Sequence, residues 1–130
     1  MMTWDMILNI LADHWVNCLF VLLACLMNAG MDSLKHSFPT SFAQGWCHSY
    51  WNPAISWMNK YSSKLPDALT DGWHLLKMFM LGFAMIAMAW GTTPTWYYDL
   101  FLFTVYAVVW NVPFPYMYYK LGGKKAQPDV

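Results

Sequence analysis

Two short stretches of this chain place an aspartate and a histidine one helical turn apart. Asp32 and His36 are four residues apart in DSLKHSF, and Asp71 and His74 are three apart in LTDGWHLLK. On a helix, either spacing puts both side chains on one face. Carboxylate oxygens and imidazole nitrogens are ligands for zinc, iron or manganese, and an open position on such a metal can activate water. The pattern therefore predicts a divalent metal site or an acid–base site.

The segment between the two pairs adds further candidates to this site. Two antiparallel helices would bring both pairs to a similar depth, with His48 in the connection between them. Asn59 and Lys60, in the same connection, are predicted to contact a substrate headgroup. The predicted metal ligands are Asp32, His36, His48, Asp71 and His74.

A purely structural interpretation explains the same residues. Asp71 would stabilise the start of a helix, and His74 would be an amphipathic residue at a membrane interface. Asp32 and His36 would mark the end of an earlier helix. The chain contains no Glu, so the helical zinc motif H-E-x-x-H is absent. Both interpretations stay open on the sequence alone.

The composition is that of a membrane protein. Hydrophobic residues make up 58% of the 130 residues and charged residues 11%, whereas about a quarter of a typical globular protein is charged. Nine Trp, eight Tyr and eight Phe suit a chain that occupies a boundary between water and lipid. Every basic residue is a Lys, so the bidentate Arg clamp for phosphate is missing and no nucleic-acid partner is expected.

The apolar runs predict an all-α integral membrane protein with three transmembrane helices. The whole chain, 1–130, is expected to form a single membrane domain. An aromatic-rich amphipathic segment is expected to lie at the interface between the first two spans. Pro113 and Pro115 should kink or stop the third. The predicted bounds are about 4–33, 66–90 and 96–119 for the spans, 38–65 for the interfacial segment and 120–130 for a polar tail.

Polar residues recur along one side of the first predicted span. In a membrane this side should face protein, because polar groups in contact with hydrocarbon cost free energy. A small bundle with such a stripe needs partners, so a homo-oligomer or a subunit of a membrane complex is expected. The residues, at spacings of 4, 4, 11 and 4, are Asn9, Asp13, Asn17, Asn28 and Asp32.

The lysines predict the orientation. The loop from Lys35 to Lys64 and the tail from Lys120 to Lys125 carry three Lys each, whereas the segments before the first span and between the second and third carry none. By the positive-inside rule, the N-terminus should lie outside and the C-terminus in the cytoplasm.

The motifs DSLKHSF, WNPAISWMNKY and LTDGWHLLK, in this order, resemble those of small uncharacterised membrane proteins from bacterial and bacteriophage genomes. The resemblance covers about the middle third of the chain. It implies no activity, but it implies that the motif residues form one unit. These residues are Asp32, His36, Trp51, Asn52, Ser56, Trp57, Asn59, Lys60, Asp71, Trp73 and His74.

Two functions remain from different classes. The first is a membrane-embedded, metal-assisted enzyme acting on a lipid or lipid-linked substrate that enters beneath the segment Trp51 to Tyr61. The second is a non-catalytic membrane subunit, a scaffold, or a virus-encoded pore or envelope protein, in which the Asp and His residues only hold helices together. Whether the protein is an enzyme is therefore left undecided by the sequence.

Overall fold

The structure, a computed structural model, describes residues 3–62, 64–66, 69–89 and 96–123. Every regular element in these residues is helical, which confirms the all-α prediction. The elements are α1 (Trp4–Asp13), α2 (Trp15–Ser37), the 3-10 turn η1 (Phe38–Thr40), α3 (His48–Trp51), α4 (Pro53–Ser56), α5 (Asn59–Ser62), α6 (Gly72–Ala89), α7 (Trp96–Asn111) and α8 (Phe114–Lys120).

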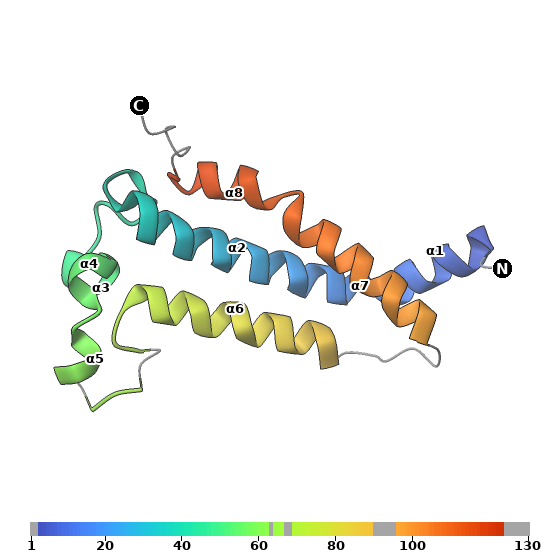
Figure 1. Cartoon of the computed structure of the whole chain (residues 1–130), viewed down its shortest axis with the longest axis horizontal. Coiled ribbons are helices and arrows are strands. Elements are labelled where there is room, and N and C mark those ends of the chain that lie inside the picture. Colours follow the sequence, from blue (N-terminus) through green and yellow to red (C-terminus); the bar gives the residue numbers. More distant parts are fainter. Residues whose placement is uncertain (1–2, 63, 67–68, 90–95, 124–130) are drawn as a thin grey trace.

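Helix α2 is the central rod of the bundle (Figure 1). Helix α6 runs back along one side of it in the opposite direction and forms the most extensive helix pair in the described residues. Helices α7 and α8 pack along the other side of α2. The short helices α3 to α5 lie at the end where α2 finishes and α6 begins, and α1 projects from the opposite end.

A row of mostly small side chains on α2 makes this packing possible. Its members are buried, and they recur at every fourth position, so they lie along one ridge of the helix. Small side chains let neighbouring helices approach closely. Gly30, next to this row, is also closely approached, because a Cβ there would meet Leu76 of α6 at 3.2 Å, with Phe42 and Leu121 farther away. The row consists of Asn17, Val21, Cys25, Ala29, Ser33 and Ser37.

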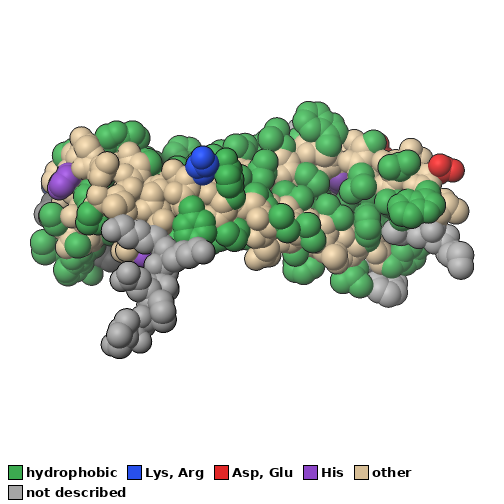
Figure 2. Space-filling view, turned by 90° about the horizontal axis from the view of Figure 1, so that it is seen from above, with side chains coloured by type: hydrophobic (Ala, Val, Ile, Leu, Met, Phe, Trp, Pro, Cys, Tyr) green, Lys and Arg blue, Asp and Glu red, His purple; other side chains and the backbone are tan. Residues whose placement is uncertain are grey.

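Large apolar side chains lie mainly on the outside of the bundle. Phe103 and Met88 are each 70% exposed, whereas the polar residues Asn17, Ser33 and Asp71 are buried. Figure 2 shows apolar side chains along the length of one face, with acidic side chains at the end near α1. Exposed apolar surface on this scale marks a membrane or protein contact.

Two helices are long and apolar enough to cross a membrane by length and composition, and they span Trp15–Thr40 and Tyr97–Lys120. The second predicted span does not reach this length. Helix α6 has 18 residues, or about 27 Å at 1.5 Å per residue, against a hydrocarbon core of about 30 Å. Of the three predicted spans, two are therefore long and apolar enough to cross a membrane within the residues that the structure describes.

The first predicted span, about 4–33, is not one helix, although its first residue matches the start of α1 at Trp4. It divides at His14, whose φ of −112° and ψ of 15° leave the helical region, and α2 continues to Ser37. Hydrogen bonds from the His14 N–H to the Ile10 carbonyl and from the Cys18 N–H to the His14 carbonyl make the break a local kink. The kink separates Asn9 and Asp13, which are exposed in α1, from Asn17, which is buried as expected.

The second predicted span starts too early. Pro66 is not the first residue of α6; its carbonyl accepts a hydrogen bond from the Leu69 N–H at 2.8 Å. Helix α6 begins six residues later, at Gly72, because the Asp71 side chain caps it there.

The third predicted span kinks where the prolines predict. Helix α7 ends at Asn111, and α8 resumes at Phe114 with Pro113 as its N-cap. The chain then returns to the end of α2: the Thr40 hydroxyl donates to the Gly122 carbonyl at 2.8 Å, and the Phe42 N–H donates to the Leu121 carbonyl at 2.8 Å. The interfacial segment and the end of α8 thus share one end of the bundle, as the lysine distribution requires.

Two glycines of α6, one in close contact with a neighbour and one in open space, allow the packing of this helix to be tested by substitution. A Cβ on Gly72 would overlap the ring of Trp51, whereas a Cβ on Gly82 would meet nothing. We expect Gly72→Ala to lower the free energy of unfolding by about 1–3 kcal/mol through overpacking, and Gly82→Ala to raise it by up to about 1 kcal/mol through helix propensity. Thermal unfolding in a mild detergent, followed by circular dichroism, measures both. Equal shifts in the two variants would contradict the contact between Trp51 and α6.

Candidate functional site

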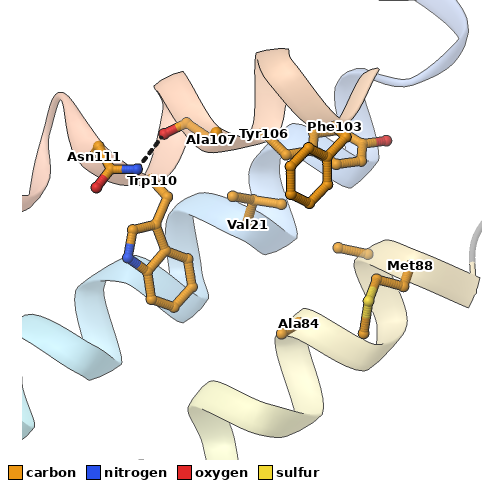
Figure 3. Close-up of a pocket in the computed structure, with 9 residues that line it drawn as sticks. Val21, Ala84, Met88, Phe103, Tyr106, Ala107, Trp110 and Asn111 are labelled. Atoms are coloured by element: carbon orange, nitrogen blue, oxygen red, sulfur yellow. Dashed lines mark hydrogen bonds between the residues drawn. The ribbon is translucent and has the colours of Figure 1, made fainter. Parts of the chain in front are cut away.

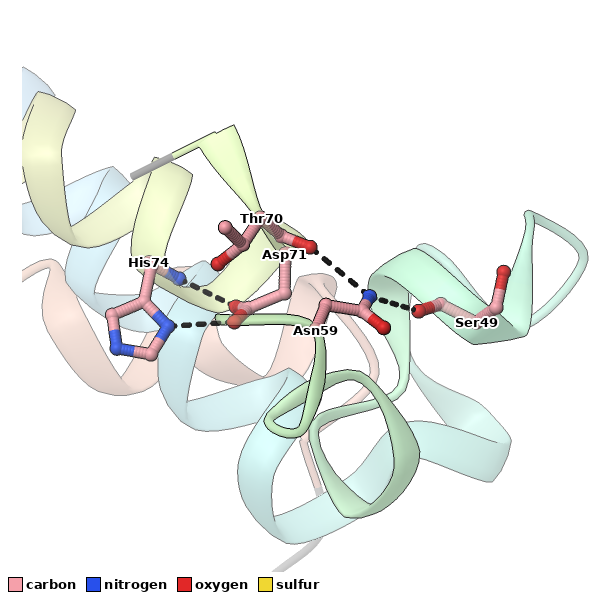
Figure 4. Close-up of polar contacts among 5 residues, drawn as sticks. All are labelled: Ser49, Asn59, Thr70, Asp71 and His74. Carbon is pink, nitrogen blue, oxygen red and sulfur yellow. Dashed lines mark hydrogen bonds and ion pairs between the residues drawn. The ribbon is translucent and has the colours of Figure 1, made fainter. Parts of the chain in front are cut away.

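Asp71 and His74 form a closed pair at the start of α6 (Figure 4). One carboxylate oxygen, Oδ1, accepts the backbone N–H of His74 at 2.9 Å and so caps the helix. The other, Oδ2, lies 2.7 Å from Nδ1 of the His74 ring. An ionised carboxylate can only accept a hydrogen bond here, so Nδ1 is the donor, and in the neutral imidazole Nε2 then presents its lone pair. The pair thus fixes both the orientation and the tautomer of the imidazole.

The two partners differ in their access to solvent. Asp71 is 1% exposed, whereas the side chain of His74 is 23% exposed. A buried carboxylate with a partly open imidazole is the arrangement by which a general base is oriented in hydrolytic enzymes. The exposed side of His74 is therefore the part of the pair that can meet a substrate.

A small cavity of about 40 Å³ adjoins the pair. This volume is enough for a water molecule, which needs a few polar partners to be held. The Ser56 hydroxyl is buried and makes no hydrogen bond with any described residue. Ser56, Asp71 and His74 are the residue types of a catalytic triad, yet Ser56 is not bonded to His74 and so is not an activated nucleophile here. The cavity is lined by Pro53, Ser56, Trp57, Asp71, Trp73 and His74.

Asn59 ties the interfacial segment to the start of α6. Its Nδ2 donates to the Ser49 carbonyl at 2.7 Å and to the Thr70 carbonyl at 3.1 Å (Figure 4). The two N–H groups of one amide nitrogen thus join Ser49 of α3 to Thr70, the residue before Asp71. The predicted headgroup contact of Asn59 stays a prediction, and the side chain of Lys60 lies outside the described part of the chain.

Trp51 is the hub of an aromatic cluster over the same region. Its ring centroid lies 4.9 Å from that of Trp46, 5.4 Å from that of Tyr50 and 6.1 Å from that of Phe42, all in edge-on arrangements. Burial, together with the negative charge of Asp71, raises the pKa of the Tyr50 phenol. Tyr50 therefore stays a neutral neighbour of the carboxylate at physiological pH.

Asp32 and His36 do not form the corresponding pair. Asp32 is half-buried and His36 is exposed, and no hydrogen bond or ion pair between them occurs in the described residues. His48 is also occupied elsewhere, because its Nε2 lies 3.0 Å from the Gln44 carbonyl oxygen and its ring meets the edge of Phe38. The structure thus joins one of the two predicted pairs.

Comparisons of the chain with protein-family models, curated proteins and solved structures find no match. The resemblance to small membrane proteins of bacteria and bacteriophages therefore stays a prediction. What the site can do has to be argued from its geometry.

The predicted metal site gains no support from that geometry. Within the described ranges, no three His, Cys, Asp or Glu side chains are placed to hold a metal ion. The five predicted ligands are spread over α2, the interfacial segment and the start of α6. Metal binding stays a prediction, and the acid–base alternative has the better geometry.

Cys47 is the one exposed cysteine, and it directly precedes α3 in the interfacial segment. A hydrogen bond between Ser49 Oγ and Cys47 Sγ, 3.0 Å apart, lowers the pKa of the thiol, and backbone N–H groups of the same turn add to the effect. Among the described residues, Cys47 Sγ is hydrogen-bonded to Ser49, whereas His48 is oriented by the contact of its Nε2 with the Gln44 carbonyl. Cys47 is therefore a reactive position but not part of a Cys–His pair.

A larger cavity of about 240 Å³ lies elsewhere, between α2, α6 and α7 (Figure 3). Its lining is almost entirely apolar, and the amide of Asn111 bonds back to the Ala107 carbonyl of its own helix. A site without a free polar group offers no acid–base chemistry. The cavity is lined by Val21, Ala84, Ala87, Met88, Phe103, Tyr106, Ala107, Trp110 and Asn111.

The two oxygens of Asp71 allow its structural and chemical roles to be separated. In Asp71→Asn, the amide oxygen would keep the cap on the His74 N–H, and the amide nitrogen would then face Nδ1 and donate to it. We expect the proton of His74 to move to Nε2, while the free energy of unfolding changes little because Asn caps as well as Asp. Asp71→Ala should lose the cap and about 0.5–2 kcal/mol.

Nitrogen-15 NMR of histidine-labelled protein in detergent, at about pH 8.5 where a free imidazole is neutral, reports the tautomer. His74→Gln identifies the signal among the four histidines. An Nδ1–H tautomer that persists in Asp71→Asn would show that the carboxylate does not set the state of the ring.

Proposed function

We propose that this chain is an integral membrane protein with an acid–base site at the membrane interface, acting on a lipid or lipid-linked substrate. The observation that carries the proposal is the 2.7 Å contact between buried Asp71 and the Nδ1 of His74. It leaves Nε2 as the proton acceptor next to a cavity large enough for water.

The surface of α7 supports the membrane placement. Its sequence is apolar on all sides, and Leu102 is the single buried side chain among those described in this helix. A helix that is apolar all round belongs in a protein core or in a membrane, and α7 is not in a core. Lipid is therefore its natural surrounding.

Helix α6 completes three spans in this proposal despite its length. It packs along α2 over most of its length, so a neighbouring helix shields it. A short apolar helix in this position is accommodated by local thinning of the bilayer. Lys77, whose Nζ lies 5.2 Å from the centre of the Trp73 ring, reaches the interface along an aromatic surface.

The end that holds Asp71 and His74 has the features of a headgroup layer. Trp57 and Tyr61 are exposed there, as are Lys35, Lys64 and Lys120. Trp and Tyr collect at membrane interfaces, and Lys on the cytoplasmic side. We place this end in the cytoplasm and the N-terminus outside.

His74 would take a proton from water or from a substrate hydroxyl through Nε2. Asp71 would stabilise the imidazolium that forms, as the carboxylate does in Ser-His-Asp enzymes. Groups in this role accelerate reactions by about 10²–10⁴-fold. No metal ion is needed for such a step, and the residues of a single helical turn are sufficient.

The alternative, a non-catalytic membrane subunit, has its own supporting observation. Asp71 caps α6, and Asn59 joins Thr70 to Ser49, so both residues also hold this end of the bundle together. The exposed apolar faces of α6 and α7 would then serve to join a homo-oligomer or a larger complex.

Lipid conversion separates these functions. Purified protein in liposomes made from a bacterial lipid extract should change the abundance of at least one lipid, followed by mass spectrometry. We expect His74→Gln and Asp71→Asn to lower that rate by about 100-fold or more. The matched control is His14→Gln, since His14 lies at the junction of α1 and α2, away from the site.

Three results would count against the acid–base site. Conversion that survives His74→Gln would remove His74 from the chemistry. No conversion by the wild-type chain, with loss of assembly in His74→Gln, would favour the structural subunit. Zinc, iron or manganese in the wild-type chain that is lost from His74→Gln would restore the metal prediction.

The native Cys47 tests the orientation. Its lowered thiol pKa and its exposure favour reaction with a membrane-impermeant maleimide. We expect labelling in inverted vesicles but not in intact spheroplasts, and none in Cys47→Ser, because Cys18 and Cys25 lie within α2. Labelling of spheroplasts would place the interfacial segment outside the cell.

A further inference from the structure

A third cavity lies between the end of α2 and the short helix α4. Its volume is about 290 Å³, several times the roughly 30 Å³ that one water occupies in the liquid. One part of its lining is polar and is formed by Lys35, His36 and Asn52. The other part is apolar and includes Leu34, Phe38 and Ala54.

The polar side chains of this cavity have hydrogen-bond donors that no described residue uses. Within the described residues, Lys35 has no ion pair and His36 makes no side-chain hydrogen bond. The Oδ1 of Asn52 accepts the Ala54 N–H at 3.1 Å, which leaves Nδ2 as its free donor. No carboxylate lines the cavity. An excess of donors with a Lys among them suits an anion, and Lys binds phosphate as a point charge.

The position of the cavity indicates which kind of anion it would bind. Lys35 lies in the last turn of α2, a helix long and apolar enough to cross a membrane, so the cavity falls at headgroup depth. A free phosphate ion would leave the exposed apolar surfaces of Pro39 and Ala54 uncovered, whereas a phospholipid carries apolar carbons directly beyond its phosphate.

We infer that this cavity binds the phosphate of an anionic phospholipid headgroup. The phosphate meets Lys35, His36 and Asn52, and the glycerol and first acyl carbons lie against Pro39 and Ala54. The inference rests on the membrane placement proposed above and not on acid–base chemistry at His74.

Helix α4 separates this cavity from the one beside Asp71 and His74. Asn52 and Ala54 line the lipid cavity, while Pro53 and Ser56 line the other. The two cavities therefore lie on different sides of a single helical turn. A substitution that abolishes binding in one cavity should therefore leave the other cavity intact.

Native mass spectrometry of the full chain in an uncharged detergent tests the inference. With equimolar phosphatidylglycerol and phosphatidylcholine, we expect phosphatidylglycerol to be retained preferentially. Lys35→Gln should lower the retained ratio by about fivefold, as expected for one basic group near an anionic lipid. Asn52→Asp should lower it as well by repulsion, while keeping the cap of α4.

The controls separate a built site from general surface charge. Lys120→Gln removes an exposed Lys at the same end of the bundle, at the last turn of α8 and outside the cavity, and should leave the ratio unchanged. An equal loss in Lys120→Gln, or equal retention of both lipids by the wild-type chain, would overturn the inference. Displacement of the lipid by inorganic phosphate would overturn the assignment to a lipid.

His74→Gln distinguishes this inference from the proposed function. We expect it to retain phosphatidylglycerol like the wild-type chain while it abolishes lipid conversion. Loss of lipid retention in His74→Gln would show that the two cavities are one site, against the separation by α4.

Discussion

Close packing against the small-residue row of α2 is the constraint on which the rest of the structure depends. Because Cys25, Ala29 and Ser33 contribute little side-chain volume, α6 and the segment formed by α7 and α8 can lie near the α2 backbone. The close approach permits two side-chain hydrogen bonds between helices, from Asn17 Nδ2 to the Ala87 carbonyl at 2.7 Å and from Cys25 Sγ to the Trp110 carbonyl at 3.0 Å. Large apolar side chains are left for the outside. In water this distribution would forgo most of the hydrophobic stabilisation of folding, whereas in lipid it costs nothing, since helix association there depends on packing and hydrogen bonds.

The antiparallel course of α2 and α6 then creates the polar end of the bundle. It brings the start of α6 beside the end of α2, where the interfacial segment covers both. An isolated carboxylate as buried as Asp71 would be costly, and its two hydrogen bonds from His74 offset that cost. The same two bonds begin the helix and orient the imidazole. Structural and chemical roles therefore coincide at this residue, and only a variant that changes one oxygen and keeps the other can tell them apart.

Sequence patterns predicted the elements better than their ends. The apolar runs and the prolines at 113 and 115 act locally along the chain, and the structure has helices and a kink at those places. Spacing also predicted two equivalent Asp and His pairs, but in the described residues the Asp71–His74 pair alone forms. Asp71 directly precedes its helix, where its carboxylate meets the N–H of the third helical residue, His74; Asp32 is inside a helix with no such donor. The sequence DGWH has an Asp three residues before a His at a helix start, and this N-cap pattern could have shown that Asp71 and His74 were the pair to form.

Nothing local marks the kink at His14 or the cavities, which depend on how distant helices cross.

Helix α4 shows how a chain with few charges can combine recognition and chemistry. Its single turn is held by the Asn52 side chain at one end and by the hydrogen bond from the Ser56 N–H to the Asn52 carbonyl at 2.8 Å. Asn52 therefore supports the wall of the lipid cavity and, through Ser56, the wall of the cavity beside His74. In the proposed function, a headgroup held by Lys35 would lie across this turn from the imidazole, and no Lys would enter the cavity beside Asp71 and His74. Keeping the phosphate site apart matters because a cation next to Asp71 would compete with His74 for the carboxylate and weaken the orientation of the ring.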